Sequence, residues 1–273
     1  MTPQVPDAAP LIVKLGGGAG LNPEPLLRDL AAHPGPWVLV HGGNAELDTL
    51  TRRLGQEPRF VTSPSGHTSR VTDAATIGLI QMAYRGRINN DLVLRLQNLG
   101  CNAVGLSGID GALLRAERKD AVRVVEGGRK FLLRDDLTGR VRSVNTDLLR
   151  LLLGNGYHPV VTLPALAATG EAVNVDGDRA AAAIAAALGA HTLVILSDVR
   201  GLLRDVADPS SLLRHAPRTG LDEADALAQG RFKNKLLGAK EALDAGAQRV
   251  VIGTAHGPHP LLAALAGEGT VLA

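Results

Sequence analysis

Residues 11–18 read LIVKLGGG, and residues 37–44 read WVLVHGGN. Each apolar run has the length of a strand, ends in glycines and is followed by a helix-like segment, which predicts two buried parallel strands. Glycine after a strand lets the backbone approach a ligand and turn N–H groups toward an anion, and a helix beginning just beyond adds its positive end. Lys14 supplies a mobile cation. The two loops together predict a cradle for a phosphoryl group.

The rest of the chain repeats the same alternation of strand and helix. Strand-like runs are found at residues 11–15, 37–41, 103–106, 158–163, 192–197 and 249–253. Helical segments are expected to begin after Asn22-Pro23 and near residues 44, 72, 145, 178 and 231, with Thr72 and Asn145 as N-caps. Such alternation predicts the α/β class, as a three-layer αβα sandwich around an open, mainly parallel sheet.

Residues 111–142 break the alternation. Their apolar and charged positions alternate around Gly127-Gly128, which predicts antiparallel hairpins that project from the sheet. Residues 115–134 carry seven basic side chains against three acidic ones. This charge fits either a solvated hairpin or a docking face for an acidic partner.

Composition excludes several classes of protein. Aromatic residues make up 2% of the 273 residues and the net charge is +2, which argues against nucleic-acid binding by base stacking or by charge. Cys101 is the single cysteine, so neither a disulfide framework nor a thiolate zinc site is expected, and the histidines lack metal spacing. No apolar run has the length of a membrane span and no signal-peptide pattern is present, so a soluble cytoplasmic protein is expected.

Two further motifs place charges at predicted helix starts. In NVDGD at residues 174–178, Asn174, Asp176 and Asp178 alternate and would share one face of an extended stretch, although an aspartate there also suits a helix cap. In GRFKNK at residues 230–235, lysines in a first helical turn oppose the helix dipole. An anion nearby would offset that cost, whereas Lys233 fits a solvated side chain.

Two polar loops complete the set. LSDVRGLL at residues 196–203 follows a strand, where polar groups can hold a nucleotide or cap a turn. SPSGHTSR at residues 63–70 ends in Arg70, whose planar donors suit a carboxylate. Neither glycine cluster has the spacing of a P-loop or of a dinucleotide-binding fingerprint.

In this order the motifs resemble those of the amino acid kinase family, most closely its acetylglutamate kinase branch. They are KLGG at 14–17, HGG at 41–43, AVGLSG at 103–108, NVDGD at 174–178, LSDVRGL at 196–202 and GRFKNK at 230–235, and they span nearly the whole chain. The resemblance implies that residues 1–170 hold the phosphoryl acceptor and residues 171–273 hold ATP. It also implies Mg²⁺ as a cofactor, held mainly by the phosphates rather than by a protein metal site, and a homodimer.

The resemblance also implies roles for single residues. Lys14 and Lys235 would contact the transferring phosphoryl group, and Asp178 would hold both lysines. The implied ligand-binding residues are Gly17, Gly42, Gly43, Asn44, Arg70 and Asn174 for the acceptor, and Ser197, Asp198, Gly201 and Leu202 for the nucleotide. A carboxylate acceptor is already deprotonated at neutral pH, so no general base is required.

Three features depart from the usual acetylglutamate kinase pattern. Asn44 stands where a third glycine is typical, the loop before Arg70 differs, and the basic segment follows Ser107-Gly-Ile-Asp-Gly111. They look more like the family member that phosphorylates 2-aminoadipate while its amino group is joined to a small acidic carrier protein, on a route to lysine. The docking residues would then be Arg115, Arg118, Lys119, Arg123, Arg129 and Lys130.

Other functions stay open at this stage. The same motifs fit an acetylglutamate kinase of arginine biosynthesis, or a kinase of carrier-bound glutamate that also uses aminoadipate. A catalytically silent nucleotide or amino-acid sensor is a different class, which the retained Lys14, Lys235 and Asp178 argue against. A non-enzymatic interaction protein would leave the paired glycine loops unexplained.

Overall fold

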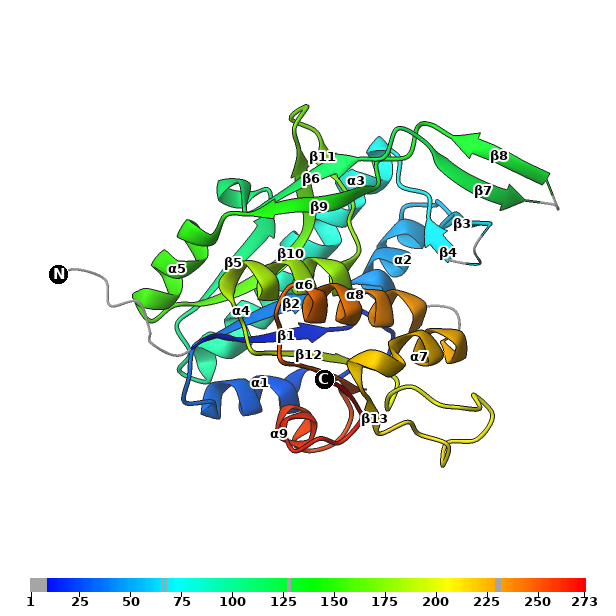
Figure 1. Ribbon diagram of the computed structural model, residues 1–273. Coiled ribbons are helices and arrows are strands. Elements are labelled where there is room, and N and C mark those ends of the chain that lie inside the picture. The colour runs from blue at the N-terminus through cyan, green and yellow to red at the C-terminus, as the bar shows by residue number, and fades with distance from the viewer. Residues whose placement is uncertain (1–8, 65, 67, 127–128, 229–231) are drawn as a thin grey trace.

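The computed structural model describes residues 9–64, 66, 68–126, 129–228 and 232–273. Within them, the main sheet is open and twisted (Figure 1). Its strand order is β13 (His215–Ala216), β15 (Thr270–Leu272), β14 (Arg249–Thr254), β12 (Thr192–Ser197), β1 (Leu11–Leu15), β2 (Trp37–His41), β10 (His158–Ala167), β6 (Leu114–Arg118) and β9 (Gly139–Val144), with β5 (Ala103–Gly108) and β11 (Ala172–Val173) also paired to β10. The strands β14, β12, β1, β2, β10 and β5 pair in parallel, so the predicted mainly parallel sheet is confirmed.

Helices cover both faces of this sheet, because successive strand residues point to opposite sides. Ile12 packs on one side with α2 (Asn44–Arg53), α3 (Ala74–Ile80), α5 (Thr146–Gly154), α6 (Gly177–Leu188), α7 (Leu221–Leu227) and α8 (Phe232–Asp244). Val13 packs on the other with α1 (Glu24–Ala32), α4 (Asn90–Asn98) and α9 (Pro260–Leu265). The three-layer αβα sandwich is therefore confirmed. Among the described residues, none of the helices has the length and apolar character needed to cross a membrane.

The helix ends follow local chemistry, with one correction. The side chain of Asn145 accepts a hydrogen bond from the backbone N–H of Leu148, so the predicted cap of α5 is confirmed. Thr72 is not the cap of α3: Asp73 accepts from Thr76 in that role, while the backbone N–H of Thr72 donates to Asp136. The helical stretch that starts there continues without a gap to Asn98, the end of α4, but it is not α-helical throughout. Nine residues, Gln81–Asn89, form a π-helix between α3 and α4.

The basic segment divides between two sheets. Strands β6 and β9 pair antiparallel and extend the main sheet, so the prediction that this pair projects is wrong. The hairpin of β7 (Val122–Glu126) and β8 (Arg129–Leu133) does project, at one end of the molecule (Figure 1). It belongs to a small antiparallel sheet in the order β4 (Thr68–Arg70), β3 (Phe60–Thr62), β7, β8. Gly127 and Gly128, expected at its turn, lie outside the described residues.

Candidate active site

Two lysines meet on one carboxylate at the centre of the molecule. Lys14 from β1 places its Nζ 2.6 Å from Oδ1 of Asp178, in the first turn of α6. Lys235 from α8 places its Nζ 3.3 Å from Oδ2 of the same side chain. The three residues are 6%, 6% and 9% exposed. Burying charges is costly even when they are paired, so such a cluster indicates function rather than stability.

Electrostatics keeps the cluster charged. Burial alone would raise the pKa of Asp178, but the ammonium groups of Lys14 and Lys235 hold that pKa below its ordinary value. Burial and the neighbouring Lys14 lower the pKa of Lys235, and the Asp178 carboxylate opposes that shift. Asp178 therefore stays ionised at neutral pH, and its carboxylate favours the protonated form of Lys235. Two cations held by one anion leave a surplus of positive charge for an anionic ligand.

Close packing of α6 and α8 brings Lys235 within contact distance of Asp178. A Cβ added to Gly238, one turn after Lys235, would lie 3.0 Å from the backbone carbon of Asp178, so a larger residue would push the helices apart. Arg179 then joins the helices through two nitrogens, Nε and Nη2, that contact the Glu241 carboxylate at 2.8 and 2.5 Å. Sequence reasoning missed Gly238. The signal was a glycine in a helix interior, which costs about 1 kcal/mol relative to alanine and calls for a packing reason.

The two glycine loops lie side by side, as predicted. A Cβ on Gly17 would stand 2.2 Å from the backbone nitrogen of Gly43 and 2.7 Å from that of Asn44. Gly42 donates its N–H to the carbonyl of Leu15, and Ala45 donates to the carbonyl of Gly17 at 2.9 Å. The second loop leads into α2, so the positive end of this helix lies at the junction. Only glycine fits at position 17.

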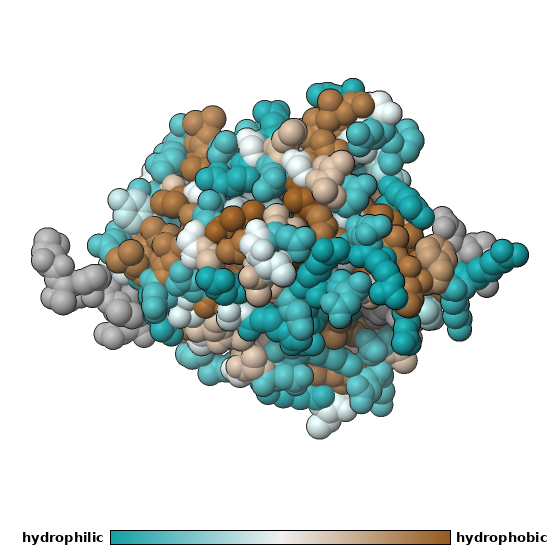
Figure 2. Space-filling model, turned by 90° about the horizontal axis from the view of Figure 1, so that it is seen from above, coloured by the Kyte–Doolittle hydropathy of each residue, from teal (hydrophilic) through white to brown (hydrophobic). Residues whose placement is uncertain are grey.

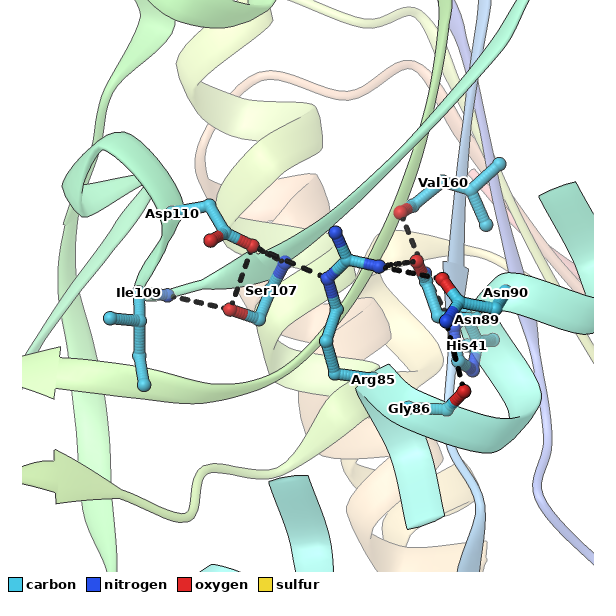
Figure 3. A network of polar contacts seen from close by, with 9 residues as sticks. All are labelled: His41, Arg85, Gly86, Asn89, Asn90, Ser107, Ile109, Asp110 and Val160. Carbon is cyan, nitrogen blue, oxygen red and sulfur yellow. Dashed lines mark hydrogen bonds and ion pairs between the residues drawn. The ribbon is translucent and has the colours of Figure 1, made fainter. Parts of the chain in front are cut away.

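His41 connects the second glycine loop to a network of polar contacts (Figure 3). Its Nδ1 donates to the carbonyl of Gly42 at 3.0 Å, and its Nε2 accepts from Nδ2 of Asn89 at 2.9 Å. Asn89 also donates to the carbonyl of Val160, and its Oδ1 accepts from Arg85 at 3.1 Å. The interpretation of His41 as a structural residue agrees with these contacts, which require a neutral imidazole.

This network predicts a loss of stability in mild acid. Burial lowers the pKa of His41 to about 4, from 6.5 for an unperturbed histidine. Between pH 6.5 and pH 4, His41 is protonated in the unfolded chain but stays neutral in the folded chain. The free energy of unfolding therefore falls as the pH drops below about 6.5. His41 alone contributes roughly 3 kcal/mol to the loss by pH 4. Urea titrations at pH 7 and pH 4.5 measure how far the free energy of unfolding falls between the two pH values. The fall should be larger in the wild type than in His41→Gln, and the difference is the contribution of His41. Equal losses would contradict it.

The acceptor-side candidates are held by protein partners. Arg70 ion-pairs with Asp48 of α2, and its guanidinium carbon lies 4.8 Å from the ring centre of Phe60. Its Nε is buried and has no hydrogen-bond partner among the described residues. Asn174 donates from Nδ2 to the Thr72 hydroxyl at 3.3 Å, two residues beyond Arg70. Sequence reasoning missed Asp48, whose i+4 spacing from Asn44 brings it to the same helix face.

The nucleotide-side candidates separate into two pairs. The Cβ of Ser197 lies 3.1 Å from where a Cβ of Gly16 would stand, and Asp198 Oδ2 lies 3.8 Å from the corresponding point on Gly18. The Ser197 hydroxyl is buried without a partner among the described residues. Gly201 and Leu202 instead pack against β15: the N–H of Leu202 donates to the hydroxyl of Thr270 at 2.8 Å, so it is already occupied.

The candidate docking residues also separate. Arg115 and Arg118 belong to β6, and Arg118 is engaged by Glu171 and by two backbone carbonyls, while Lys119 follows the strand and is exposed. Cross-strand pairing in the small sheet matches Val125 with Lys130 and Arg123 with Leu132, and strand residues two apart share a face. Arg123, Lys130 and Leu132 therefore lie on one face, and Arg129 lies on the other.

The pairing register extends the first of these faces toward Arg70. Thr62 of β3 pairs with Val125 of β7, and Phe60 of β3 pairs with Arg70 of β4. Arg70 and Phe60 thus share the face that carries Arg123 and Lys130. Figure 2 shows hydrophilic surface at the projecting end of the molecule, next to a small apolar area. The exposed hydrophobic residues of this hairpin include Leu132.

The sequence model of the amino acid kinase family matches residues 10–254, so this chain belongs to the amino acid kinase family and is a phosphotransferase. Among its relatives, the LysW-aminoadipate kinase of Deinococcus radiodurans is 50% identical over 268 residues, which cover 96% of this chain and 91% of that protein. The enzyme of the same name from Thermus thermophilus is 46% identical over 270 residues, covering 96% and 99%. The acetylglutamate kinase of Methanopyrus kandleri is 38% identical over 263 residues, covering 96% and 99%.

Solved structures agree on the fold. Carbamate kinase from Giardia lamblia bound to AMP-PNP superposes with a TM-score of 0.69 at 14% identity, covering 97% of this chain and 98% of that one. N-acetylglutamate synthase from Neisseria gonorrhoeae gives a TM-score of 0.77 at 24% identity, covering 97% of this chain and 59% of that one. The family and the fold predicted from the sequence are both confirmed.

Proposed function

We propose that this chain uses ATP to phosphorylate the side-chain carboxylate of 2-aminoadipate attached through its amino group to a small acidic carrier protein, giving an acyl phosphate in lysine biosynthesis. The observation that carries the kinase reaction is the buried Lys14–Asp178–Lys235 cluster. The 46–50% identity to two LysW-aminoadipate kinases over nearly the whole chain supports this acceptor.

Phosphoryl transfer to a carboxylate requires positive charge at the reacting groups, and the two lysines of the cluster provide it. Phosphoryl transfer to a carboxylate brings two anions together and spreads charge over the equatorial oxygens. Lys14 and Lys235 reach the transferring group from β1 and α8, and Asp178 keeps both ammonium groups in place. Amides of Gly17 and Gly43 donate to the phosphoryl oxygens, with Gly42 shaping the turn. Such preorganised donors stabilise the transition state without a general base.

ATP and Mg²⁺ are the proposed co-substrate and cofactor. The buried hydroxyl of Ser197, which has no hydrogen-bond partner in the part of the chain that is described, and the carboxylate of Asp198 beside Gly18 suit a polyphosphate and its metal. Gly201 and Leu202 are proposed to complete the nucleotide site. In the part of the chain that is described, no three His, Cys, Asp or Glu residues gather as metal ligands. Mg²⁺ would then be held mainly by the phosphates and supply charge neutralisation. In this proposal residues 171–273 bind ATP and residues 1–170 bind the acceptor.

The acceptor side is proposed to use Asn44, Arg70 and Asn174. Arg70 would offer its Nε–H, which has no partner among the described residues, to an acceptor carboxylate while Asp48 holds the adjacent Nη2. The second candidate function is phosphorylation of free acetylglutamate or of carrier-bound glutamate, favoured by the 38% identity to an acetylglutamate kinase and the 41% identity to a putative dual LysW-aminoadipate/LysW-glutamate kinase of Cenarchaeum symbiosum. A cytoplasmic homodimer is part of the proposal.

Trapping the acyl phosphate with hydroxylamine separates these acceptors. The purified protein is given ATP and Mg²⁺ with free acetylglutamate, with carrier-bound aminoadipate or with carrier-bound glutamate. We expect the largest kcat/KM with carrier-bound aminoadipate. Turnover of acetylglutamate alone would reject the carrier, and turnover of none of the three would reject the proposed function.

Docking of the carrier yields a prediction with a matched control. The candidates are the six basic residues named from the sequence, but the pairing register puts Arg123 and Lys130 on the Arg70 face and Arg129 on the opposite face. The double change Arg123→Glu with Lys130→Glu should raise the KM for the loaded carrier about tenfold or more at low ionic strength, because two attractive charges become repulsive. Arg129→Glu is the control and should change it less than threefold.

Salt and ATP provide the two remaining checks of the docking face. Raising the ionic strength should narrow the gap between the double variant and the wild type, since screening weakens both attraction and repulsion. The KM for ATP should be unchanged in all variants. If Arg129→Glu raised the KM for the loaded carrier as much as the double variant does, or if the double variant left it unchanged, the carrier would not dock on this face.

A further inference from the structure

Tyr84 of the π-helix lies directly under the second glycine loop. Its side chain is buried, and its hydroxyl donates to Oδ1 of Asn44 at 2.8 Å. A Cβ on Gly43 would stand 2.6 Å from a carbon of the Tyr84 ring and 2.5 Å from the Cδ1 of Ile88. The aromatic ring thus forms the floor of the loop, and its hydroxyl holds the one side chain that departs from the glycine pattern.

The π-helical turn explains how one segment reaches the loop at two points. In a π-helix the hydrogen bonds run from residue i to i+5, so residues five apart lie on the same side of the helix. Tyr84 and Asn89 have this spacing, and they contact Asn44 and His41 at the two ends of the same four-residue loop. An α-helical turn would direct the two side chains to different sides. Such π-helical turns are frequent at functional sites.

The contact with Tyr84 uses Oδ1 of Asn44 and leaves the Nδ2 group of its carboxamide to bind a ligand. Oδ1 accepts from Tyr84, so the Nδ2 group is directed away from the tyrosine, and the Asn44 side chain is exposed at the start of α2. Its backbone nitrogen and that of Gly43 face Gly17, at the proposed phosphoryl cradle. A neutral donor at this place can bind an oxygen without adding to the charge of the lysine cluster.

We propose that Tyr84 is a positioning residue that locks the Asn44 carboxamide so that Nδ2 donates a hydrogen bond to the carboxylate of the acceptor. This inference rests on the proposed function and adds a specificity element to it. An exposed asparagine side chain rotates freely and loses that freedom on binding. Anchoring by a buried hydroxyl removes this cost before the acceptor arrives, so the loss of the anchor weakens acceptor binding rather than ATP binding.

The test compares Tyr84→Phe, Asn44→Ala and the double variant in steady-state kinetics. Tyr84→Phe keeps the ring under Gly43 and removes only the hydroxyl. We expect it to raise the KM for the acceptor about fivefold, the usual worth of one neutral hydrogen bond, with the KM for ATP within twofold of the wild type. The double variant should be no worse than Asn44→Ala. Tyr157→Phe, at the chain's other tyrosine, is the matched control and should behave as the wild type.

A binding measurement separates this inference from the proposed function. In ¹⁵N-labelled protein, the side-chain NH₂ signals of Asn44 should shift when the acceptor is added to the wild type, and should shift less in Tyr84→Phe. An unchanged acceptor KM together with equal shifts in both proteins would overturn the role of Tyr84. Multiplicative losses in the double variant would overturn it as well. Failure of the wild type to bind or turn over any of the three acceptors would instead refute the proposed function, and this inference with it.

Discussion

Replacing Lys235 with methionine is expected to lower kcat about 1000-fold, which corresponds to roughly 4 kcal/mol of transition-state stabilisation. Methionine keeps the length of the side chain in the α8–α6 interface and removes only the charge. Lys14→Met should have an effect of the same order, because the two cations act on the same transferring group in the proposal. The measurement is kcat for the acyl phosphate, with binding of ATP followed separately.

The control for this prediction lies on the same helix. Lys233→Met makes the same change two residues earlier, at a side chain that is only partly buried, and should leave kcat within about threefold. Circular dichroism of all three variants checks that the fold is retained. A Lys235→Met protein that keeps more than a tenth of the wild-type kcat would exclude a direct role for this lysine in the transfer.

Asp178→Asn should be nearly as severe, for a different reason. The two buried ammonium groups would then face one another without the carboxylate that holds them, and removal of one partner from a buried charge cluster costs about 3–5 kcal/mol of stability. We expect kcat to fall about 100-fold and the free energy of unfolding to fall by roughly 3 kcal/mol. Asp176→Asn is the matched control, because an asparagine there can still accept the hydrogen bonds from Asp178 and Arg179 that cap α6.

The pH profile identifies how Asp178 acts. Burial and Lys14 already lower the pKa of Lys235, and two carboxylates oppose that shift: Asp178, by charge and a hydrogen bond, and to a smaller extent Asp176 by charge. Without the Asp178 carboxylate the pKa of Lys235 falls further, so the protonated form is lost at a lower pH. The alkaline limb of kcat against pH should therefore move to lower pH in Asp178→Asn, and should move less in Asp176→Asn, because Asp176 makes the smaller contribution to the pKa of Lys235. An unmoved limb in Asp178→Asn would argue that the carboxylate does not control the charge of Lys235.

The sequence predicted those parts of the fold that have a local signal. Apolar runs ending in glycine located β1 and β2, and Asn145 marked a helix start that the structure reproduces. The π-helix had no such signal, because its nine residues have the composition of an ordinary helix. The prediction that β6 and β9 project failed for a similar reason: pairing of β6 with β10 is a contact between residues about 50 apart, which alternation of side chains cannot show.

The residues of the candidate site also fall into two groups: those that the sequence indicated and those that only the structure shows. The resemblance to the amino acid kinase family pointed to Lys14, Asp178 and Lys235, and their types fit a transferring phosphoryl group, which requires cations and a group that holds them. The supporting residues were invisible because their roles depend on distance in space. Gly238 matters through the backbone of Asp178, 60 residues away, and Tyr84 matters through a side chain 40 residues away. Arg70 illustrates the limit best, because its type indicated a carboxylate ligand while its partner in the structure is the carboxylate of Asp48.

A crystal structure with ADP, Mg²⁺, the acceptor and aluminium fluoride shows whether both lysines contact the transferring phosphoryl group, because the fluoride complex mimics that group in the transition state. We expect Nζ of Lys14 and Nζ of Lys235 both to lie within about 3 Å of fluoride ligands, the distance of a charge-assisted hydrogen bond, on opposite sides of the aluminium. A complex in which either nitrogen stays on Asp178 alone, beyond reach of the fluorides, would contradict it.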